Sequence, residues 1–236
     1  MKKFLFALPT VLLALLMSGY GKEPDDELIG KLSASDDNVI FVESNPVNER
    51  KFYVSQAYVV GDYVRTKLGG GKILIIADPD FKKDRRMNDF VAAMKKGSDN
   101  EVVIDTVKLP KQTCEEMAEP IDERMKTKDL EAVVARHGDA KVVVSLIGFP
   151  RDIHKHPKLL QDCKTGKGPK IILLVSDVPQ LAKMIGAGMV TAAVTVSPKA
   201  KFDENPASSD EKAAFAVRYI LIDKSNIAGN EGLFGE

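Results

Sequence analysis

The sequence has no tryptophan, and only 6% of its 236 residues are aromatic. Surfaces on which sugar rings or unpaired bases stack need several aromatic rings close together, so we expect no broad stacking platform. The chain also lacks an excess of one charge, because 34 Lys and Arg residues stand against 34 Asp and Glu residues. Without a basic excess, nucleic acid is not an expected partner.

Cysteine is scarce, with Cys114 and Cys163 far apart in the sequence. An oxidising compartment permits a disulfide between them, and the alternative is two separate thiols. The sequence contains no Cys-x-x-Cys, Gly-x-Ser-x-Gly, His-Glu-x-x-His or Walker pattern. No motif therefore predicts a redox centre, a serine nucleophile, a zinc site or a phosphate-binding loop, and we expect neither a cofactor nor a metal ion.

Long hydrophobic runs are absent except at the N-terminus. Lys2 and Lys3 precede an uncharged run over residues 4–17, and Gly19-Tyr20-Gly21 fits a small-x-small cleavage site. The run is too short for an ordinary membrane-spanning helix. We expect a bacterial signal peptide over residues 1–21 and a periplasmic or secreted protein, the alternative being a buried N-terminal helix. Tyr20 stands where a lipoprotein signal has its cysteine, so no stable membrane anchor is expected.

The rest of the chain divides into a polar linker and one predicted domain. Residues 22–38 are polar and acidic, which is typical of a solvated linker. From residue 39, short apolar runs alternate with helical patterns. The predicted strands cover residues 39–42, 72–77, 102–107, 142–147, 171–175, 190–196 and 219–222, and the predicted helices cover 55–67, 85–96, 130–137, 157–163, 181–188 and 209–217.

The pattern predicts an α/β fold for residues 39–236. Continuous β-branched runs indicate strands that are covered on both faces. Regular alternation of strands and helices indicates right-handed crossovers in a Rossmann-like, three-layer, doubly wound and mostly parallel sheet of about six strands. In such sheets ligands bind beyond the carboxyl ends of the strands.

Two sets of polar residues are candidates for chemistry. Asp78 and Asp80 follow the predicted strand 72–77. Paired carboxylates suit Mg²⁺ or acid–base chemistry, whereas the intervening Pro79 favours a simple turn. His154 and His156 have a weak metal-ligand spacing, and solvated loop histidines are the alternative.

Two further candidates follow predicted strands. Arg86, at the start of the predicted helix 85–96, can bind a carboxylate or sugar hydroxyls, or it is an ordinary surface residue. Asp177 follows Ser176 directly after the predicted strand 171–175. It lies at the expected binding edge, where capping of the following helix is its competing role.

Three stretches together resemble the type I periplasmic binding proteins, the ribose-binding-like sugar receptors. The first runs from Asn38 to Pro46 and on to the predicted strand 72–77. The second is Arg86-Met-Asn-Asp-Phe90, and the third extends from Ser176 to Pro198. The resemblance covers about residues 38–223.

The resemblance implies a crossover segment followed by the C-terminal lobe of a two-lobed receptor. The ligand contacts of that family carry over to Arg86 and Asp177. Val42 occupies the position of the aspartate that follows the family's crossover strand, and Glu43 lies beside it. Glu43, and Ser176 next to Asp177, are therefore further ligand-binding candidates.

The implied function is a non-catalytic, exported domain that binds a small, sugar-like polar ligand or a partner protein completing the cleft. A membrane permease is an implied partner. Two alternatives remain open: an enzyme that uses Asp78, Asp80 or Asp177, and a self-associating interaction domain without a ligand.

Overall fold

The computed structural model describes residues 46–109, 119–155, 158–174, 178, 180–206 and 210–234. The predicted signal peptide, the linker and the predicted strand 39–42 lie outside these residues, as do Cys114 and His156. The described strands are β1 (Ile73–Ala77), β2 (Val102–Thr106), β3 (Val142–Ser145), β4 (Lys170–Leu173), β5 (Ala192–Val196) and β6 (Tyr219–Asp223). The α-helices are α2 (Pro46–Lys67), α3 (Arg86–Ser98), α4 (Ile121–Arg124), α5 (Thr127–Arg136), α6 (Lys158–Lys164), α7 (Leu181–Gly186) and α8 (Glu211–Arg218), and the 3-10 helices are η2 (Phe81–Lys83), η4 (Ile153–Lys155) and η5 (Glu231–Phe234).

The strands form one sheet in the order β2-β1-β3-β4-β5-β6. Strands β1 to β5 pair in parallel, and β6 pairs antiparallel with β5. Among the described strands, β1 comes first in the sequence, β2 lies on one side of it, and β3 to β6 follow in order on the other side, which is the doubly wound arrangement. The predicted fold class, with a mostly parallel sheet of about six strands, is confirmed.

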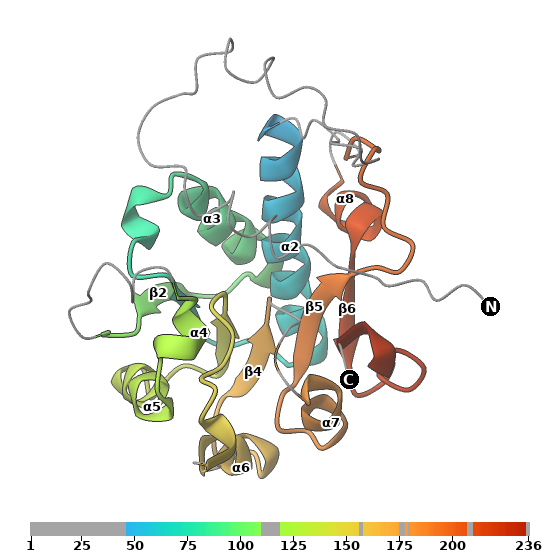
Figure 1. Cartoon of the computed structure of the whole chain (residues 1–236). Coiled ribbons are helices and arrows are strands. Elements are labelled where there is room, and N and C mark those ends of the chain that lie inside the picture. The colour runs from blue at the N-terminus through green and yellow to red at the C-terminus, as the bar shows by residue number, and fades with distance from the viewer. Residues whose placement is uncertain are drawn as a thin grey trace, which may run out of the picture. The chain divides into compact units, whose positions relative to one another are not determined.

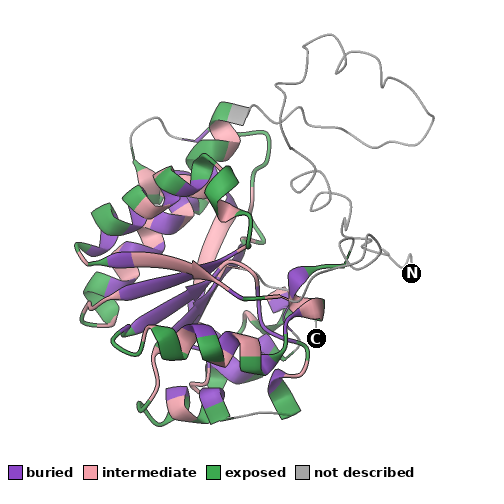
Figure 2. Ribbon diagram, turned by 90° about the vertical axis from the view of Figure 1, so that its left-hand side faces the viewer, coloured by how far each residue is buried: buried purple, intermediate pink, exposed green. Residues whose placement is uncertain are grey.

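Helices cover both faces of the sheet, which gives three layers (Figure 1). Helices α2, α3 and α8 pack on one face, and α4 to α7 pack on the other. The strands between them are largely buried (Figure 2). Because each strand is covered on both faces, the apolar runs are continuous rather than alternating.

Helix α2 is longer than its apolar pattern predicts. It begins at Pro46, where the fixed φ of proline suits the first turn of a helix, and Glu49 lies in that first turn. Because Asn48, Glu49 and Arg50 are polar, the first turns of α2 show no apolar periodicity in the sequence. In the structure they make contacts with α3, α8 and the loop before α8.

Cys163 is a buried free thiol in α6, as the interpretation of separate thiols requires. Burial raises the pKa of this thiol to about 11, so it stays protonated at neutral pH. Within the described residues, no helix combines the length and the apolar character needed to cross a bilayer.

The N-terminus of α8 is capped by Asp210, whose carboxylate accepts the backbone N–H groups of Lys212 at 2.9 Å and Ala213 at 3.2 Å. The Asp210→Ala variant leaves both donors without this partner. We expect it to lower the free energy of unfolding by about 1 kcal/mol, measured by urea titration. Asp210→Asn, which retains an acceptor oxygen, is the control. Equal stability of Asp210→Ala and wild type would contradict the role of the cap.

Candidate functional site

The stretch from the end of β1 to the first residue of α3 holds three of the predicted site residues. The Asp78 carboxylate accepts the backbone N–H of Asp80 at 2.7 Å, and its carbonyl oxygen accepts the N–H of Phe81 at 2.9 Å. Asp80 pairs with Lys83 at 2.8 Å on the surface. These bonds stabilise a local turn, so the structure shows the turn that Pro79 favours.

Arg86 is held in one orientation by Asp84. Its Nε lies 3.0 and 3.2 Å from the two Asp84 carboxylate oxygens, and its Nη2 donates to Oδ2 at 2.8 Å. The backbone N–H of Arg86 also donates to Asp84, at 2.9 Å. The Arg86 side chain remains 45% exposed. A fork-to-carboxylate bond of this kind fixes the plane of the guanidinium group.

The ionisation of this pair follows from its surroundings. Burial by itself raises the pKa of the Asp84 carboxyl group, but hydrogen bonds from Arg86 outweigh burial, and the net pKa is lowered. The hydrogen bond to Asp84 raises the pKa of Arg86. Both groups are therefore charged at neutral pH, and the pair is neutral as a unit.

Aromatic residues support the pair from the side of α2. The Arg86 guanidinium carbon lies 5.7 Å from the centroid of the Tyr53 ring, and that ring packs against Phe90 with centroids 4.7 Å apart. Burial raises the pKa of the Tyr53 hydroxyl, and the nearby Asp84 carboxylate raises it further. The Tyr53 side chain is therefore uncharged at neutral pH, and its ring lies beside Arg86. An ion pair between Arg50 and Asp89 joins α2 and α3 near the same end.

Sequence reasoning missed Asp84. The available signal was the Asp-x-Arg spacing at the start of α3, which places a carboxylate beside Arg86. The apolar periodicity of α3 gave no reason to examine a residue just outside the helix.

The other predicted site residues are not gathered around Arg86 by any described contact. Glu43, Ser176 and Asp177 lie outside the described residues, so their roles remain predictions. The Asp78 carboxylate bonds within its own turn, and the Asp80 carboxylate pairs with Lys83.

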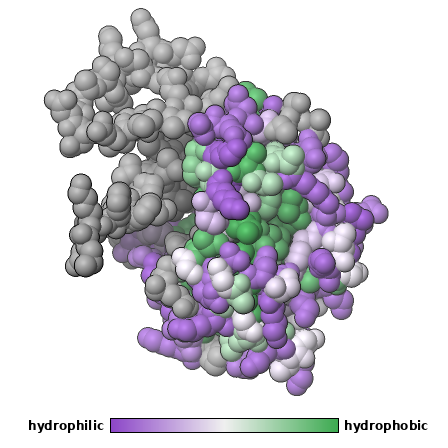
Figure 3. All heavy atoms as spheres, turned by 90° about the vertical axis from the view of Figure 1, so that its right-hand side faces the viewer, coloured by the Kyte–Doolittle hydropathy of each residue, from purple (hydrophilic) through white to green (hydrophobic). Residues whose placement is uncertain are grey.

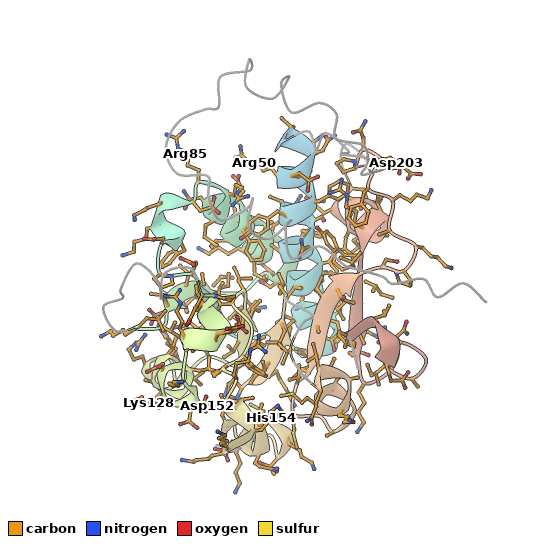
Figure 4. The ribbon with its side chains drawn as sticks, viewed as in Figure 1. Arg50, Arg85, Lys128, Asp152, His154 and Asp203 are labelled. Carbon is orange, nitrogen blue, oxygen red and sulfur yellow. The ribbon has the colours of Figure 1, made fainter. Side chains whose placement is uncertain are left out.

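The histidine-containing loop lies in a different part of the molecule. The Asp152 carboxylate accepts the N–H and hydroxyl of Thr127, at 2.9 and 2.8 Å, at the start of α5. Figure 4 shows Asp152 and His154 on the side of α5 and α6, whereas Arg50 and Arg85 lie on the side of α2 and α3. Among the described residues, no three His, Cys, Asp or Glu side chains form a group that could hold a metal ion.

Two shallow hollows lie elsewhere on the described surface. One, of about 530 Å³, lies between α2 and α3 and includes Arg50 and Lys96. The other, of about 450 Å³, lies at the amino edge of the sheet between the glycines 69–71 and Lys141 and Lys170. Neither hollow is lined by a predicted site residue.

Comparisons with known proteins find similarity at the level of structure. No protein-family model and no curated protein matches the sequence. Similar solved structures include a carbohydrate transporter from Acidothermus cellulolyticus 11B in complex with myo-inositol (14% identity, 75% of this chain and 59% of that chain, TM-score 0.47). Others are a sugar-binding protein of a sugar ABC transporter from Bacillus halodurans (10%, 76% and 63%, 0.45) and a solute-binding protein from Agrobacterium radiobacter in complex with D-arabinose (11%, 81% and 64%, 0.45).

The chain spans about 60% of the length of these solved structures.

Proposed function

We propose that this chain is a non-catalytic binding domain that takes a small polar ligand at the carboxyl end of β1, with Arg86 as the main contact. One observation carries the proposal: Asp84 fixes the Arg86 guanidinium group from one side, yet almost half of the side chain stays exposed. Ordering the arginine in advance lowers the entropy lost on binding.

The neutral pair suits a ligand with hydroxyl groups. A hydroxyl accepts from a guanidinium N–H and donates to a carboxylate oxygen, so it can bond to both partners of the pair. A free anion gains less, because Asp84 already neutralises Arg86. We therefore propose a sugar-like ligand, as the motif resemblance implies.

The proposed setting is the bacterial periplasm. Residues 1–21 act as the signal peptide, and the domain lies outside the cytoplasm. Glu43, Ser176 and Asp177 are proposed as further contacts to the ligand. A ligand site normally encloses most of its ligand, so we propose that a partner such as a permease covers the side that one lobe leaves open. The enzyme alternative has less support because Asp78 and Asp80 are bonded within their own turn.

The test is a thermal-shift screen of the purified protein against pentoses, hexoses and nucleosides. A ligand that binds only the folded state raises the melting temperature by mass action. For the ligand that gives the largest shift, Arg86→Lys keeps the positive charge but removes the paired N–H donors of the guanidinium group. We expect this variant to bind that ligand about tenfold or more weakly. Asp84→Asn frees the guanidinium group and is expected to weaken binding in the same direction.

Arg85→Lys is the matched control, because it changes the same residue type one position earlier in the exposed chain. Its affinity should equal that of wild type. The proposal fails if no compound shifts the melting temperature, or if Arg86→Lys binds as well as wild type.

A further inference from the structure

The guanidinium group of Arg124, at the end of α4, has buried donors without a partner. Its Nε and Nη1 atoms are out of reach of water, and neither makes a hydrogen bond within the described residues. These two atoms carry more than half of the N–H donors of a guanidinium group. Charged side chains normally lie on the surface, as Figure 3 shows for the hydrophilic side chains on the side that carries β6 and α8. Arg124 is therefore an exception that needs a physical explanation.

A guanidinium group that is withdrawn from water without an anion destabilises the folded state. An arginine side chain keeps its charge in proteins, so loss of a proton cannot relieve the cost of burial. The Nε of Arg218 is also buried and unbonded, but its Nη1 donates to both Glu49 carboxylate oxygens, at 2.7 and 2.9 Å. Around Arg124 the chain is partly apolar, because Ile121, one turn earlier, and Met125, the next residue, are buried in the core. An oxyanion beside Arg124 would remove the cost.

The carboxylates of α4 are already paired with a different cation. The Nε of Arg151, in the loop after β3, lies 3.2 Å from Asp122 Oδ2, and its Nη2 lies 2.9 Å from Glu123 Oε1. Both acidic residues of the helix are therefore bound to Arg151. Within the described parts of the chain, no carboxylate forms an ion pair with Arg124.

Arg124 lies at the edge of the sheet where ligands bind in doubly wound folds. The chain reaches α4 after the carboxyl end of β2, and α4 covers the opposite face of the sheet from α3 (Figure 1). The backbone N–H of Arg151, which follows the carboxyl end of β3, donates to the Asp122 carbonyl oxygen at 3.3 Å. Strands β2 and β3 flank β1 on its two sides. The helix is thus tied to the carboxyl edge, beyond which such sheets hold their ligands.

We propose that Arg124 binds the carboxylate or phosphate group of a small ligand. A guanidinium cation and an oxyanion form charge-assisted hydrogen bonds, which are strong where water is excluded. Because the residue as a whole is only partly buried, a change of rotamer of this long side chain can bring its buried donors to the ligand. The inference goes beyond the proposed sugar site, because Arg86 lies on another helix and its pair with Asp84 is neutral as a unit.

The first test is the thermal stability of Arg124→Met in the absence of ligand. Methionine keeps an apolar stem and removes the unpaired buried cation, so the melting temperature should not fall and is expected to rise by about 2 °C. The control is Arg85→Met, which makes the same change at an exposed position and should leave the melting temperature unchanged. A clear fall for Arg124→Met would show that Arg124 is paired inside the folded chain, and would overturn the proposal.

The second test is a thermal-shift series at constant ionic strength with inorganic phosphate, gluconate and glucuronate, and with glucose as the neutral comparison. An anion that binds only the folded state raises the melting temperature by mass action. We expect phosphate or one of the two carboxylates to raise it in wild type and in Arg85→Met, and not in Arg124→Met. Arg124→Lys keeps a positive charge but has no planar set of donors, and it should bind the anion about tenfold more weakly.

The remaining outcomes separate this site from the one at Arg86. The proposal is wrong if none of the three anions shifts wild type, or if Arg124→Met keeps the full shift. A shift that is lost in Arg86→Lys and kept in Arg124→Met would place the anion at Arg86 instead. A shift that requires Arg124 supports the site, and comparison of phosphate with the two acids shows which oxyanion it prefers. Neutral sugars test Arg86 and anions test Arg124, so failure of one proposal is distinguishable from failure of the other.

Discussion

Replacing Gly97 with alanine is expected to destabilise the protein strongly. A Cβ atom at Gly97 would lie 2.2 Å from the carbonyl oxygen of Tyr58 and 3.0 Å from the amide nitrogen of Asp62. Both of those atoms belong to the backbone of α2, so no side chain can rotate to make room. The reverse contact is equally close, because a Cβ atom at Gly61 would lie 2.5 Å from the Met94 carbonyl oxygen. The two helices must therefore move apart before either site accepts a methyl group.

Two effects oppose each other in the Gly97→Ala variant. Alanine favours the helical state by about 1 kcal/mol relative to glycine. Separating two packed helices costs about 3 kcal/mol or more, at the upper end of what overpacking costs in protein cores. The clash wins, and we expect a net loss of about 2 kcal/mol or more in the free energy of unfolding, measured by urea titration.

Gly186→Ala in α7 is the matched control. A Cβ atom there meets nothing within 4 Å, so the helix propensity of alanine acts alone and stability should stay equal or rise slightly. A Gly97→Ala protein as stable as wild type would show that α2 and α3 do not approach through their glycines.

Neutralising Glu49 is expected to destabilise the protein more than removing its partner Arg218. The Arg218 side chain is 7% exposed, whereas the Glu49 side chain is 37% exposed. Glu49→Gln therefore leaves a buried guanidinium cation without its anion, an arrangement that costs several kcal/mol in fully buried pairs. Because Glu49 is partly solvated, we expect a smaller loss, about 2 kcal/mol, measured by urea titration.

Arg218→Met tests the other side of the pair. Methionine fills the space between the Phe52 and Phe202 rings with an apolar chain of similar length, and Glu49 can then turn toward water. We expect a loss below about 1.5 kcal/mol. The double variant should be no less stable than Arg218→Met alone, since its buried charge is already gone.

Glu204→Gln is the control for the Glu49 variant. Glu204 pairs with Lys201 on the surface, where both side chains are about half exposed, and such pairs contribute little to stability. We expect no measurable change. If Arg218→Met proves more destabilising than Glu49→Gln, then the packing of Arg218, and not its charge, dominates this corner.

The positions of strands and most helices could be predicted from the sequence. The run Ile73–Ala77 is continuous and apolar because both faces of β1 are covered, and this pattern is independent of distant contacts. In α3, Met87, Phe90 and Met94 share one buried face, so their spacing predicts the helix. Helix α4 (Ile121–Arg124) was not predicted, and other errors fall at element ends, where β3 stops at Ser145 and β4 at Leu173, before the predicted ends at residues 147 and 175.

The local sequence determined which segments form strands and helices and that Arg86 opens the helix after the strand at 73–77, because these depend on periodicity along the chain. Tertiary structure alone decided the first turns of α2, the contact between Gly61 and Gly97, and the burial of Arg218 between two aromatic rings. Glu49 and Arg218 are 169 positions apart, and no local pattern links them. Long-range pairs of this kind form only when the folded sheet brings its covering helices together, since their energy depends on distance in space and on exclusion of water.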